Sequence, residues 1–198
     1  MKFKRTHYCG AVSAALVGSE IVVAGFVQRI RDQGALVFVT LRDREGIVQL
    51  TFDDQTDPAL RALAQTVRSE FVLMAKGVVR IRESINRTMK NGDVELYVTD
   101  LDIVSAAQTP PFEIVSPTKV SDELRYKYRY LDLRRSELQE NIITRHKIVN
   151  CIHEYFNDNG FLEIETPNLI RATPEGARDY LVPSRVNKGS FYSFTFVF

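Results

Sequence analysis

The hydrophobic periodicity of this chain changes once along its length, and this change most constrains what the chain can fold into. In the first half, apolar and polar residues alternate in short runs separated by turn formers, which is typical of β-strands. In the second half, apolar residues recur at helical spacing over a long stretch. Residues 108–120 between them contain three prolines, which hinder a helix and stiffen a connector. We predict a domain at 1–107, a hinge linker at 108–120 and a second domain at 121–198, with one long loop inside a single domain as the alternative.

The first domain is predicted to contain five strands, with a short helix between the third and the fourth. The strands are expected at residues 20–28, 36–42, 47–52, 71–82 and 94–104, and the helix at 57–67. Asp57 is expected to cap this helix, with Pro58 at its first helical position. This order of elements is that of an OB-fold, a partly open β-barrel that often binds oligonucleotides.

The alternation also predicts which side chains face outward from this barrel. Phe38 and Arg42 in the second strand and Gln49 in the third point away from the apolar side, near Arg29 and Arg31. A phenylalanine ring stacks on an unstacked base for ~1–3 kcal/mol, while guanidinium and amide groups hold phosphates and base edges. If the register were shifted by one residue, Phe38 would instead be a core residue, and surface arginines are often only solvated.

The second half opens with a dense cluster of arginine and tyrosine at residues 126–135 and continues as a long helical pattern from Ser136. Asn159 and Gly160 supply a left-handed stop for this helix. The alternating segment Phe161–Thr166 is then predicted to be a strand that ends at Pro167. The arginine–tyrosine cluster could be an RNA-facing patch or a salt-bridged joint between the domains, and we favour the joint.

These motifs carry a resemblance to a known family. A long helix followed by a strand that ends in proline resembles the first signature motif of class II aminoacyl-tRNA synthetases. The strings YRYLDLRR at 128–135 and TPEGARDYLVPSR at 173–185 resemble the N-terminal portion of the bacterial-type aspartyl-tRNA synthetases, and the match covers about residues 5–192. The expected fold class is therefore α+β: a five-stranded OB-fold barrel, followed by the truncated start of a class II catalytic domain with a long helix and antiparallel strands.

The resemblance implies how the barrel is used. In this family the N-terminal OB-fold holds the tRNA anticodon, and the resemblance assigns anticodon binding to Arg29, Arg31, Phe38, Gln49 and Glu95. Phe38 would stack on a base, Gln49 would read a base edge, and Glu95 would accept hydrogen bonds from guanine. The family commonly has three consecutive arginines where this chain has two arginines around an isoleucine, which weakens the expected backbone contact. Whether asparagine tRNA is also accepted stays open.

The resemblance also implies roles in the second domain. The long helix and its strand form the homodimer interface in class II synthetases, and Pro167 takes the place of the proline at the edge of the active site. Glu175 takes the place of the glutamate that binds the ammonium group of the substrate aspartate through a charge-assisted hydrogen bond.

The family pattern breaks after Tyr192, where the chain reads SFTFVF and stops. The ATP and Mg²⁺ sites of the full-length family lie beyond this point, so we expect the chain to retain anticodon recognition and the dimer motif but to be inactive alone as an aspartate–tRNA ligase. A fragment, a frameshifted reading frame and a deliberate truncation would each explain the tail. The alternatives are a free-standing, non-catalytic OB-fold tRNA-binding protein and a fragment of a related asparaginyl- or lysyl-type synthetase.

Composition limits the kind of nucleic-acid site that the chain can carry and the cellular compartment that suits it. The formal net charge of +1 excludes a globally basic nucleic-acid binder, so an RNA site must be a local patch. Cys9 and Cys151 lack metal-ligand spacing and are expected to be buried free thiols, which suits a reducing cytoplasm. His146 and His153 share a helical face without a third ligand, so we expect no metal site. No apolar run approaches the ~20 residues that span a bilayer, and no secretory signal follows the first residues, so we expect a cytoplasmic protein without membrane contact.

Overall fold

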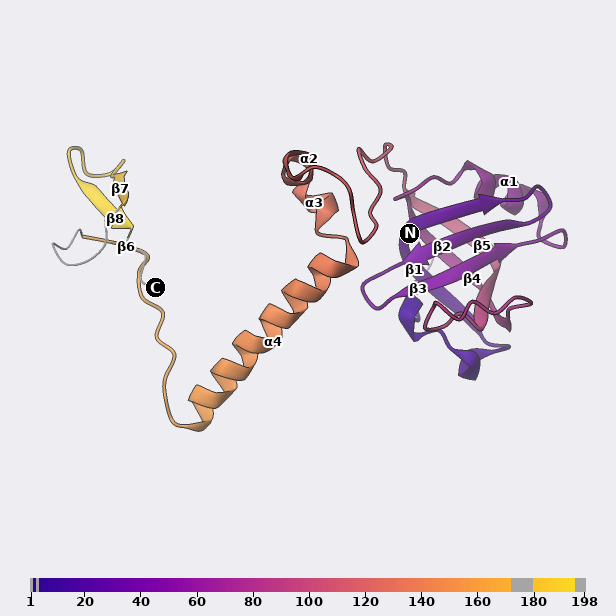
Figure 1. Ribbon diagram of the computed structural model, residues 1–198, viewed down its shortest axis with the longest axis horizontal. Coiled ribbons are helices and arrows are strands. Elements are labelled where there is room, and N and C mark those ends of the chain that lie inside the picture. The colour runs from indigo at the N-terminus through magenta and orange to yellow at the C-terminus, as the bar shows by residue number, and fades with distance from the viewer. Residues whose placement is uncertain (1, 3, 172–179, 195–198) are drawn as a thin grey trace. The chain divides into compact units, whose positions relative to one another are not determined.

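The computed structural model describes residues 2, 4–171 and 180–194. The chain divides into two compact units, Met1–Glu137 and Leu138–Phe198, which are described separately. The first unit contains a β-barrel and two short helices that follow it, and the second contains most of one long helix and a small sheet (Figure 1).

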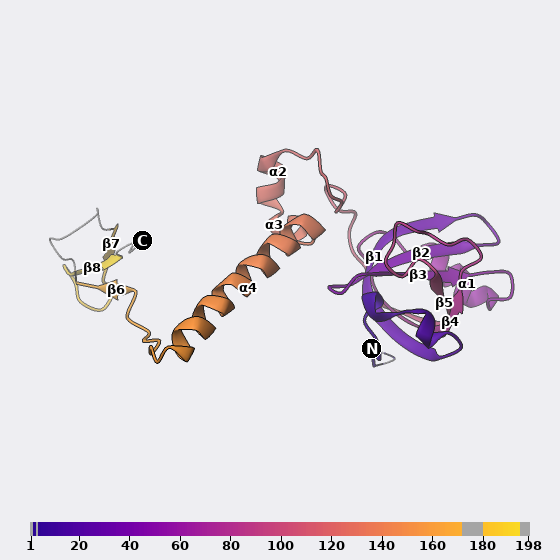
Figure 2. The same ribbon diagram turned by 60° about the horizontal axis from the view of Figure 1, so that its bottom comes forward.

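Five strands form a closed barrel in the first unit (Figure 2). They are β1 (Glu20–Asp32), β2 (Val37–Arg42), β3 (Ile47–Phe52), β4 (Val72–Ile81) and β5 (Val94–Ser105). The order around the barrel is β1-β2-β3-β5-β4. β4 pairs with β1 in antiparallel fashion, and β3 pairs with β5 in parallel fashion, so every strand has two neighbours. The predicted OB-fold is therefore confirmed.

The barrel core is filled by the inward residues of each strand. In β2, Val37, Val39 and Leu41 are fully buried, while Phe38 and Thr40 between them are only half-buried. The predicted register of this strand is therefore confirmed, because a shift by one residue would have exchanged the two faces. The remaining core comes mostly from valine and leucine, whose branched side chains suit a pleated surface.

One helix, α1 (Pro58–Thr66), connects β3 to β4 and packs on the barrel through Leu60 and Ala64. The carboxylate of Asp57 accepts hydrogen bonds from the backbone N–H groups of Ala59 at 2.9 Å and Leu60 at 3.0 Å. Asp57 is thus the N-cap and Pro58 the first helical residue, as the sequence predicts.

Two short 3₁₀ helices, η1 (Cys9–Ala11) and η2 (Ala14–Leu16), precede the barrel. Cys9 is a fully buried free thiol in the core, and burial raises its pKa. Cys151 is also free, but it is exposed, so the expectation that both thiols are buried is wrong for this one. The reason is that Cys151 lies on a long helix without any buried residue.

The segment after the barrel folds back into its own small cluster. Phe112 and Ile114, from the proline-containing stretch, are buried against Leu131. Two short helices follow: α2 (Asp122–Lys127) and α3 (Arg129–Asp132). Asp132 is completely buried and forms salt bridges with three arginines of the same segment, Arg125, Arg129 and Arg135, at 3.2, 2.7 and 3.5 Å. The arginines of the cluster are therefore held by salt bridges to a buried carboxylate, whereas Tyr126 and Tyr130 are exposed.

The long helix α4 (Ser136–Asp158) ends as the sequence predicts. Gly160 has φ +79°, and the N–H groups of Gly160 and Phe161 bond to the carbonyls of Asn157 and Phe156, both at 3.0 Å. The rings of Phe156 and Phe161 meet edge to face, with centroids 5.2 Å apart. This is the Schellman pattern, with its usual apolar contact across the helix end.

The predicted strand at Phe161–Thr166 is wrong. These residues form no strand, and the side chains of Leu162 and Ile164 are 85% and 76% exposed. Alternation alone does not make a strand, because a strand needs a hydrogen-bonded neighbour, and no described strand pairs with this segment. The sheet lies further along, with β8 between its two partners, and consists of β6 (Leu169–Ile170), β7 (Tyr180–Pro183) and β8 (Phe191–Phe194), all antiparallel.

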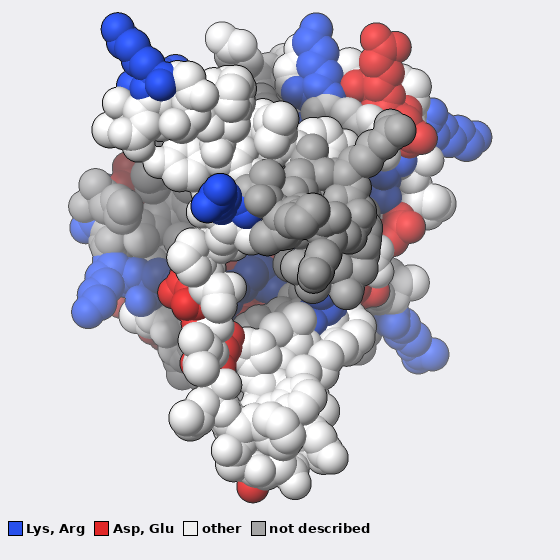
Figure 3. Space-filling view, turned by 90° about the vertical axis from the view of Figure 1, so that its left-hand side faces the viewer, with Lys and Arg blue, Asp and Glu red and all other residues white. Residues whose placement is uncertain are grey.

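The second unit presents a large uncharged surface. The exposed apolar residues of α4 are Ile142, Ile143, Ile148, Val149, Ile152, Tyr155 and Phe156. The lower part of Figure 3, formed by the end of α4 and the turn after it, is almost entirely free of charged side chains. No described helix has the length and apolarity required to cross a membrane.

Candidate nucleic-acid interface

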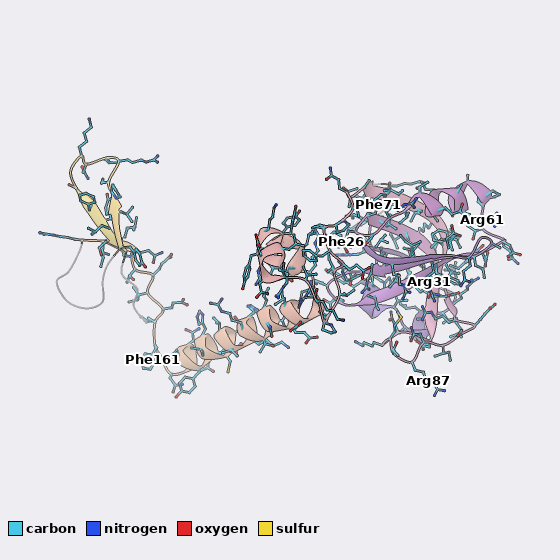
Figure 4. All side chains as sticks on the ribbon, turned by 45° about the horizontal axis from the view of Figure 1, so that its top comes forward. Phe26, Arg31, Arg61, Phe71, Arg87 and Phe161 are labelled. Carbon is cyan, nitrogen blue, oxygen red and sulfur yellow. The ribbon has the colours of Figure 1, made fainter. Side chains whose placement is uncertain are left out.

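A groove of about 870 Å³, here called the first groove, is lined by residues of β1, β2, β3, β4 and β5. Its lining combines arginines, carboxylates, an aromatic ring and side-chain amides. The residues that matter below are Arg31, Phe38, Gln49, Thr51, Asp53, Arg80, Arg82, Asn86, Arg87 and Glu95. Figure 4 labels Arg31 on the barrel wall and Arg87 on the loop that follows β4.

Strand pairing brings these side chains together from distant parts of the sequence. Phe38 lies opposite Arg31 of β1 on one side and opposite Thr51 of β3 on the other. Arg80 of β4 lies opposite Glu95 of β5. The guanidinium carbon of Arg31 is 5.2 Å from the centre of the Phe38 ring, within the range of a cation–π contact. The groove therefore has a positively charged group beside its aromatic ring.

Glu95 is the centre of a hydrogen-bond network at the floor of the groove. Its Oε2 accepts hydrogen bonds from Gln49 Nε2 at 2.8 Å and from Thr51 Oγ1 at 2.7 Å. Its Oε1 accepts a hydrogen bond from Arg80 Nε at 2.8 Å. Glu95 is only 5% exposed, and a buried carboxylate needs such partners because its charge is otherwise costly in a protein interior. A carboxylate has about four acceptor positions, so one remains for a ligand.

The amide of Gln49 is held in one orientation by this network. Its Oε1 accepts hydrogen bonds from Arg31 at 3.2 Å and from Arg82, while its Nε2 donates to Glu95. Among the described residues, the second N–H of this amide has no further hydrogen-bond partner. The groove thus offers a fixed donor at Gln49 and a fixed acceptor at Glu95, which together suit the edge of a nucleobase.

The charges of the first groove are balanced. Burial opposes the ionised form of Asp53, but hydrogen bonds from Arg80, Gln55 and Thr56 outweigh it, and the pKa of Asp53 lies below its ordinary value. Burial likewise disfavours charged Arg80, but the hydrogen bonds to Glu95 and Asp53 raise its pKa. Burial lowers the pKa of Arg82. The lining holds four arginines and four carboxylates, so it is suited to base edges more than to phosphates.

The structure places the predicted residues as follows. Arg31, Phe38, Gln49 and Glu95 meet in the first groove. Arg29 does not, and instead lines a neighbouring groove of about 960 Å³, here called the second groove. In the other unit, Pro167 is exposed in the segment after α4.

The predicted aspartate-binding Glu175 lies outside the described residues. Among the described residues, no three of histidine, cysteine, aspartate and glutamate gather closely enough to bind a metal ion.

Sequence reasoning missed several residues of the first groove, above all Arg80, Arg82 and Asp53. A signal for two of them exists: Val79 belongs to the core, so the alternation of β4 places Arg80 and Arg82 on the outward face. The position of Arg80 opposite Glu95 follows only from the β4–β5 register, which the sequence does not reveal.

Comparisons with known proteins agree with this architecture. Residues 21–104 match the family described as OB-fold nucleic acid binding domain, and residues 121–196 match tRNA synthetases class II (D, K and N). The asparaginyl-tRNA synthetase from Pyrococcus horikoshii, complexed with asparaginyl-adenylate, has the same fold with a TM-score of 0.82 at 22% identity, over 97% of this chain and 42% of that one. The fold and the groove thus define an anticodon-type OB barrel followed by the start of a class II synthetase domain.

Curated relatives narrow this class to one kind of synthetase. The aspartate–tRNA(Asp/Asn) ligases of Syntrophotalea carbinolica and Symbiobacterium thermophilum are 49% and 53% identical to this chain over 96% of its length. The chain is homologous to the N-terminal portion of bacterial-type aspartyl-tRNA synthetases. It spans about a third of the length of the curated relatives it matches, 32% in both cases.

Proposed function

We propose that this chain recognises the anticodon loop of aspartate tRNA, as part of an aspartate–tRNA ligase that attaches aspartate to its tRNA with ATP. The observation that carries this proposal is the meeting of Phe38, Gln49 and Glu95 in the charge-balanced first groove of an OB barrel. A stacking ring, a fixed amide and a fixed carboxylate are what single-stranded RNA bases require for stacking and for recognition of their edges.

The geometry assigns a task to each group. A base stacks on the half-buried ring of Phe38, with the guanidinium of Arg31 beside it. The free N–H of Gln49 donates to a carbonyl or ring nitrogen of a base, and the open acceptor position of Glu95 takes an N–H of guanine. These contacts replace water around the bases, and the rigid network keeps Gln49 and Glu95 in place before the RNA arrives.

We also propose that the chain accepts the anticodon loops of both aspartate and asparagine tRNA. The curated relatives are named as ligases for both tRNAs. By the genetic code, the two anticodons, GUC and GUU, share their first two bases and differ only in the third. A groove that reads the shared bases with Phe38, Gln49 and Glu95 therefore binds both loops. The identity to aspartate ligases favours this reading over an asparaginyl- or lysyl-type fragment or a free-standing tRNA-binding protein.

The remaining functions are proposed on family grounds. ATP and Mg²⁺ would supply the activation of aspartate in the full-length enzyme, but no described residues gather into a metal site, so no step is assigned to them here. Glu175 would bind the ammonium group of aspartate, and the protein would act in the cytoplasm. The division into an anticodon domain at 1–107, a linker at 108–120 and a catalytic portion from 121 belongs to the same proposal.

A homodimer through the apolar face of α4 and Pro167 is also proposed. The uncharged surface of α4, with Ile148 and Ile152 about half exposed, is what such an interface would cover. Sedimentation velocity tests it: the chain should sediment as a dimer and Ile152→Arg as a monomer, whereas a wild-type monomer at every concentration would contradict it.

Nuclear magnetic resonance tests the proposed anticodon site. The chain, labelled with ¹⁵N, is titrated with an aspartate anticodon stem-loop, and the side-chain resonances of Gln49, Arg31 and Arg80 are followed. We expect these signals to shift and the Gln65 amide, which is exposed on α1, to remain in place. Shifts confined to other faces of the barrel would show that the first groove is not the site.

A further inference from the structure

The second groove lies against the first, between the barrel and the stretch of chain that leaves it. One wall is formed by Arg29, Thr40 and Arg42 of the barrel, and the other by Pro110, Phe112 and Ile114. Arg31, Gln49, Arg82 and Asn86 line both grooves. A strand of RNA bound in the first groove therefore has a continuous path into the second.

A β-bulge shapes the barrel wall of this groove. The register between β1 and β2 shifts between Val27 and Arg29, which leaves Gln28 as the extra residue. Val27 points into the core, whereas Gln28 and Arg29 both line the second groove. A bulge lets two consecutive side chains serve the same face, and bulges are common beside binding sites for this reason.

The wall of this groove contains buried polar atoms without a partner. Oε1 of Gln28, Nη1 of Arg42 and Nε of Arg82 are buried, and none has a hydrogen-bond partner among the described residues. The other terminal nitrogen of Arg42 is occupied, because it donates to both oxygens of Glu70 at 2.9 and 3.1 Å. Buried polar groups in proteins are almost always paired, so these atoms indicate that a ligand supplies one donor and at least one acceptor.

The charge of the groove points to an anion. Its lining holds four arginines, Arg29, Arg31, Arg42 and Arg82, against two carboxylates, Glu70 and Glu113. In the first groove the same number of arginines is balanced by carboxylates. A ribonucleotide offers both of the required features, a phosphate as acceptor and a 2′-hydroxyl as donor.

We propose that the second groove binds the ribose and phosphate of a nucleotide next to the bases in the first groove. Gln28 accepts a hydrogen bond from the 2′-hydroxyl, Arg29 and Arg42 donate to the phosphate, and Phe112 packs against the sugar. This inference rests on the proposed function, because the two grooves share Arg31 and Gln49. It makes Gln28 the residue with which the chain distinguishes RNA from DNA.

Fluorescence anisotropy with the whole chain tests this. The probes are the aspartate anticodon stem-loop and a series of the same loop in which one nucleotide at a time carries 2′-deoxyribose. We expect one position beside the anticodon to weaken binding about fivefold when its hydroxyl is removed. Gln28→Leu should weaken binding of the all-RNA loop by a similar factor and should no longer respond to the deoxy substitution.

Two further variants separate this contact from a general loss of structure. Gln28→Glu keeps an acceptor at the same place, so it should still distinguish the deoxy loop from the all-RNA loop. Gln65→Leu, on the exposed face of α1 and outside both grooves, should bind every loop as the wild type does.

The outcomes are distinct. If no single deoxy position weakens binding more than about twofold, or if Gln28→Leu still responds to it, the second groove is wrongly assigned. The preference for the cognate anticodon would then survive, and the proposed function with it. If the wild type binds cognate and altered anticodons equally, both proposals fail.

Discussion

Arg134 donates a hydrogen bond of 2.8 Å to Glu70, which lies 64 residues earlier and just before β4, and so ties the segment after α3 to the barrel. Glu70 is 5% exposed, and it also holds Arg42 of β2 at 2.9 Å. Its φ of +64° lies in the left-handed region, which costs a residue other than glycine free energy. At this strained position the carboxylate of Glu70 joins two arginines, Arg42 and Arg134.

Glu70→Ala should destabilise the protein most among variants of this joint. It leaves the guanidinium of Arg42, whose side chain is 13% exposed, without its buried partner, and breaking such a pair costs ~3–5 kcal/mol. Arg134→Ala should cost less, about 1 kcal/mol, because that side chain is 31% exposed and solvent screens the pair. Urea denaturation measures both, and equal losses for the two variants would show that Glu70 is not the centre of the joint.

Phe38→Leu should weaken binding of the anticodon loop without unfolding the barrel. Phe38 is half-buried and lies outside the core, so the loss should be that of base stacking, ~1–3 kcal/mol or about five- to 150-fold in affinity. Tyr126→Leu, which removes an aromatic ring that is 67% exposed and lies in neither groove, is the control. If both variants bind alike in an anisotropy assay, Phe38 does not stack on RNA.

Glu95→Gln should reduce the preference for guanine more than the total affinity. The substitution keeps the shape of the side chain but replaces one acceptor oxygen by an NH₂ donor. Gln49, Thr51 and Arg80 all donate to Glu95 in the wild type, so this NH₂ group meets a donor where an acceptor was. Replacing the guanine of the anticodon by inosine removes its exocyclic amine. Inosine should weaken binding to the wild type by about fivefold and to Glu95→Gln by little, and an undiminished effect in the variant would exclude Glu95 as the acceptor.

Asp53 should stabilise the protein at neutral pH and lose this effect in acid. Its pKa is lower in the folded chain than its ordinary value, so the folded state favours the ionised form. The stabilisation is complete above the pKa of the unfolded state, about 3.9, and disappears as the pH falls through the lower folded value. Asp53→Asn should therefore flatten the acid branch of a stability–pH profile, whereas Asp54→Asn, at an exposed neighbour, should leave it unchanged.

The sequence was sufficient for the barrel because short apolar runs separated by turn formers mark each strand, and the alternation of β2 is regular. Val37, Val39 and Leu41 predict the core face of β2, and Phe38 follows on the other face. The alternation at Phe161–Thr166 led to a wrong strand prediction because no described strand pairs with this segment. The residues of the segment do not reveal whether a pairing partner is present.

The site was predictable only in part, for a similar reason. Arg29 and Arg31 both follow the bulge at Gln28 and both line the second groove, but only Arg31 also lines the first. A bulge depends on the register of two strands, and one strand's sequence does not contain it. The positive charge of Arg80 is balanced by salt bridges to Glu95 and Asp53, and these salt bridges likewise form only in the closed barrel.

The central claim is that the first groove reads anticodon bases and does not merely attract phosphates. The most direct test compares the affinity of the chain for two stem-loops, one with the anticodon GUC and one with the same bases in reverse order, at the same salt concentration. Phosphate contacts respond to salt and not to base order, so composition and charge are matched in the two loops. We predict at least about a tenfold preference for GUC, since reversal leaves polar groups of Gln49 and Glu95 unpaired. Equal affinity for the two loops would contradict the account.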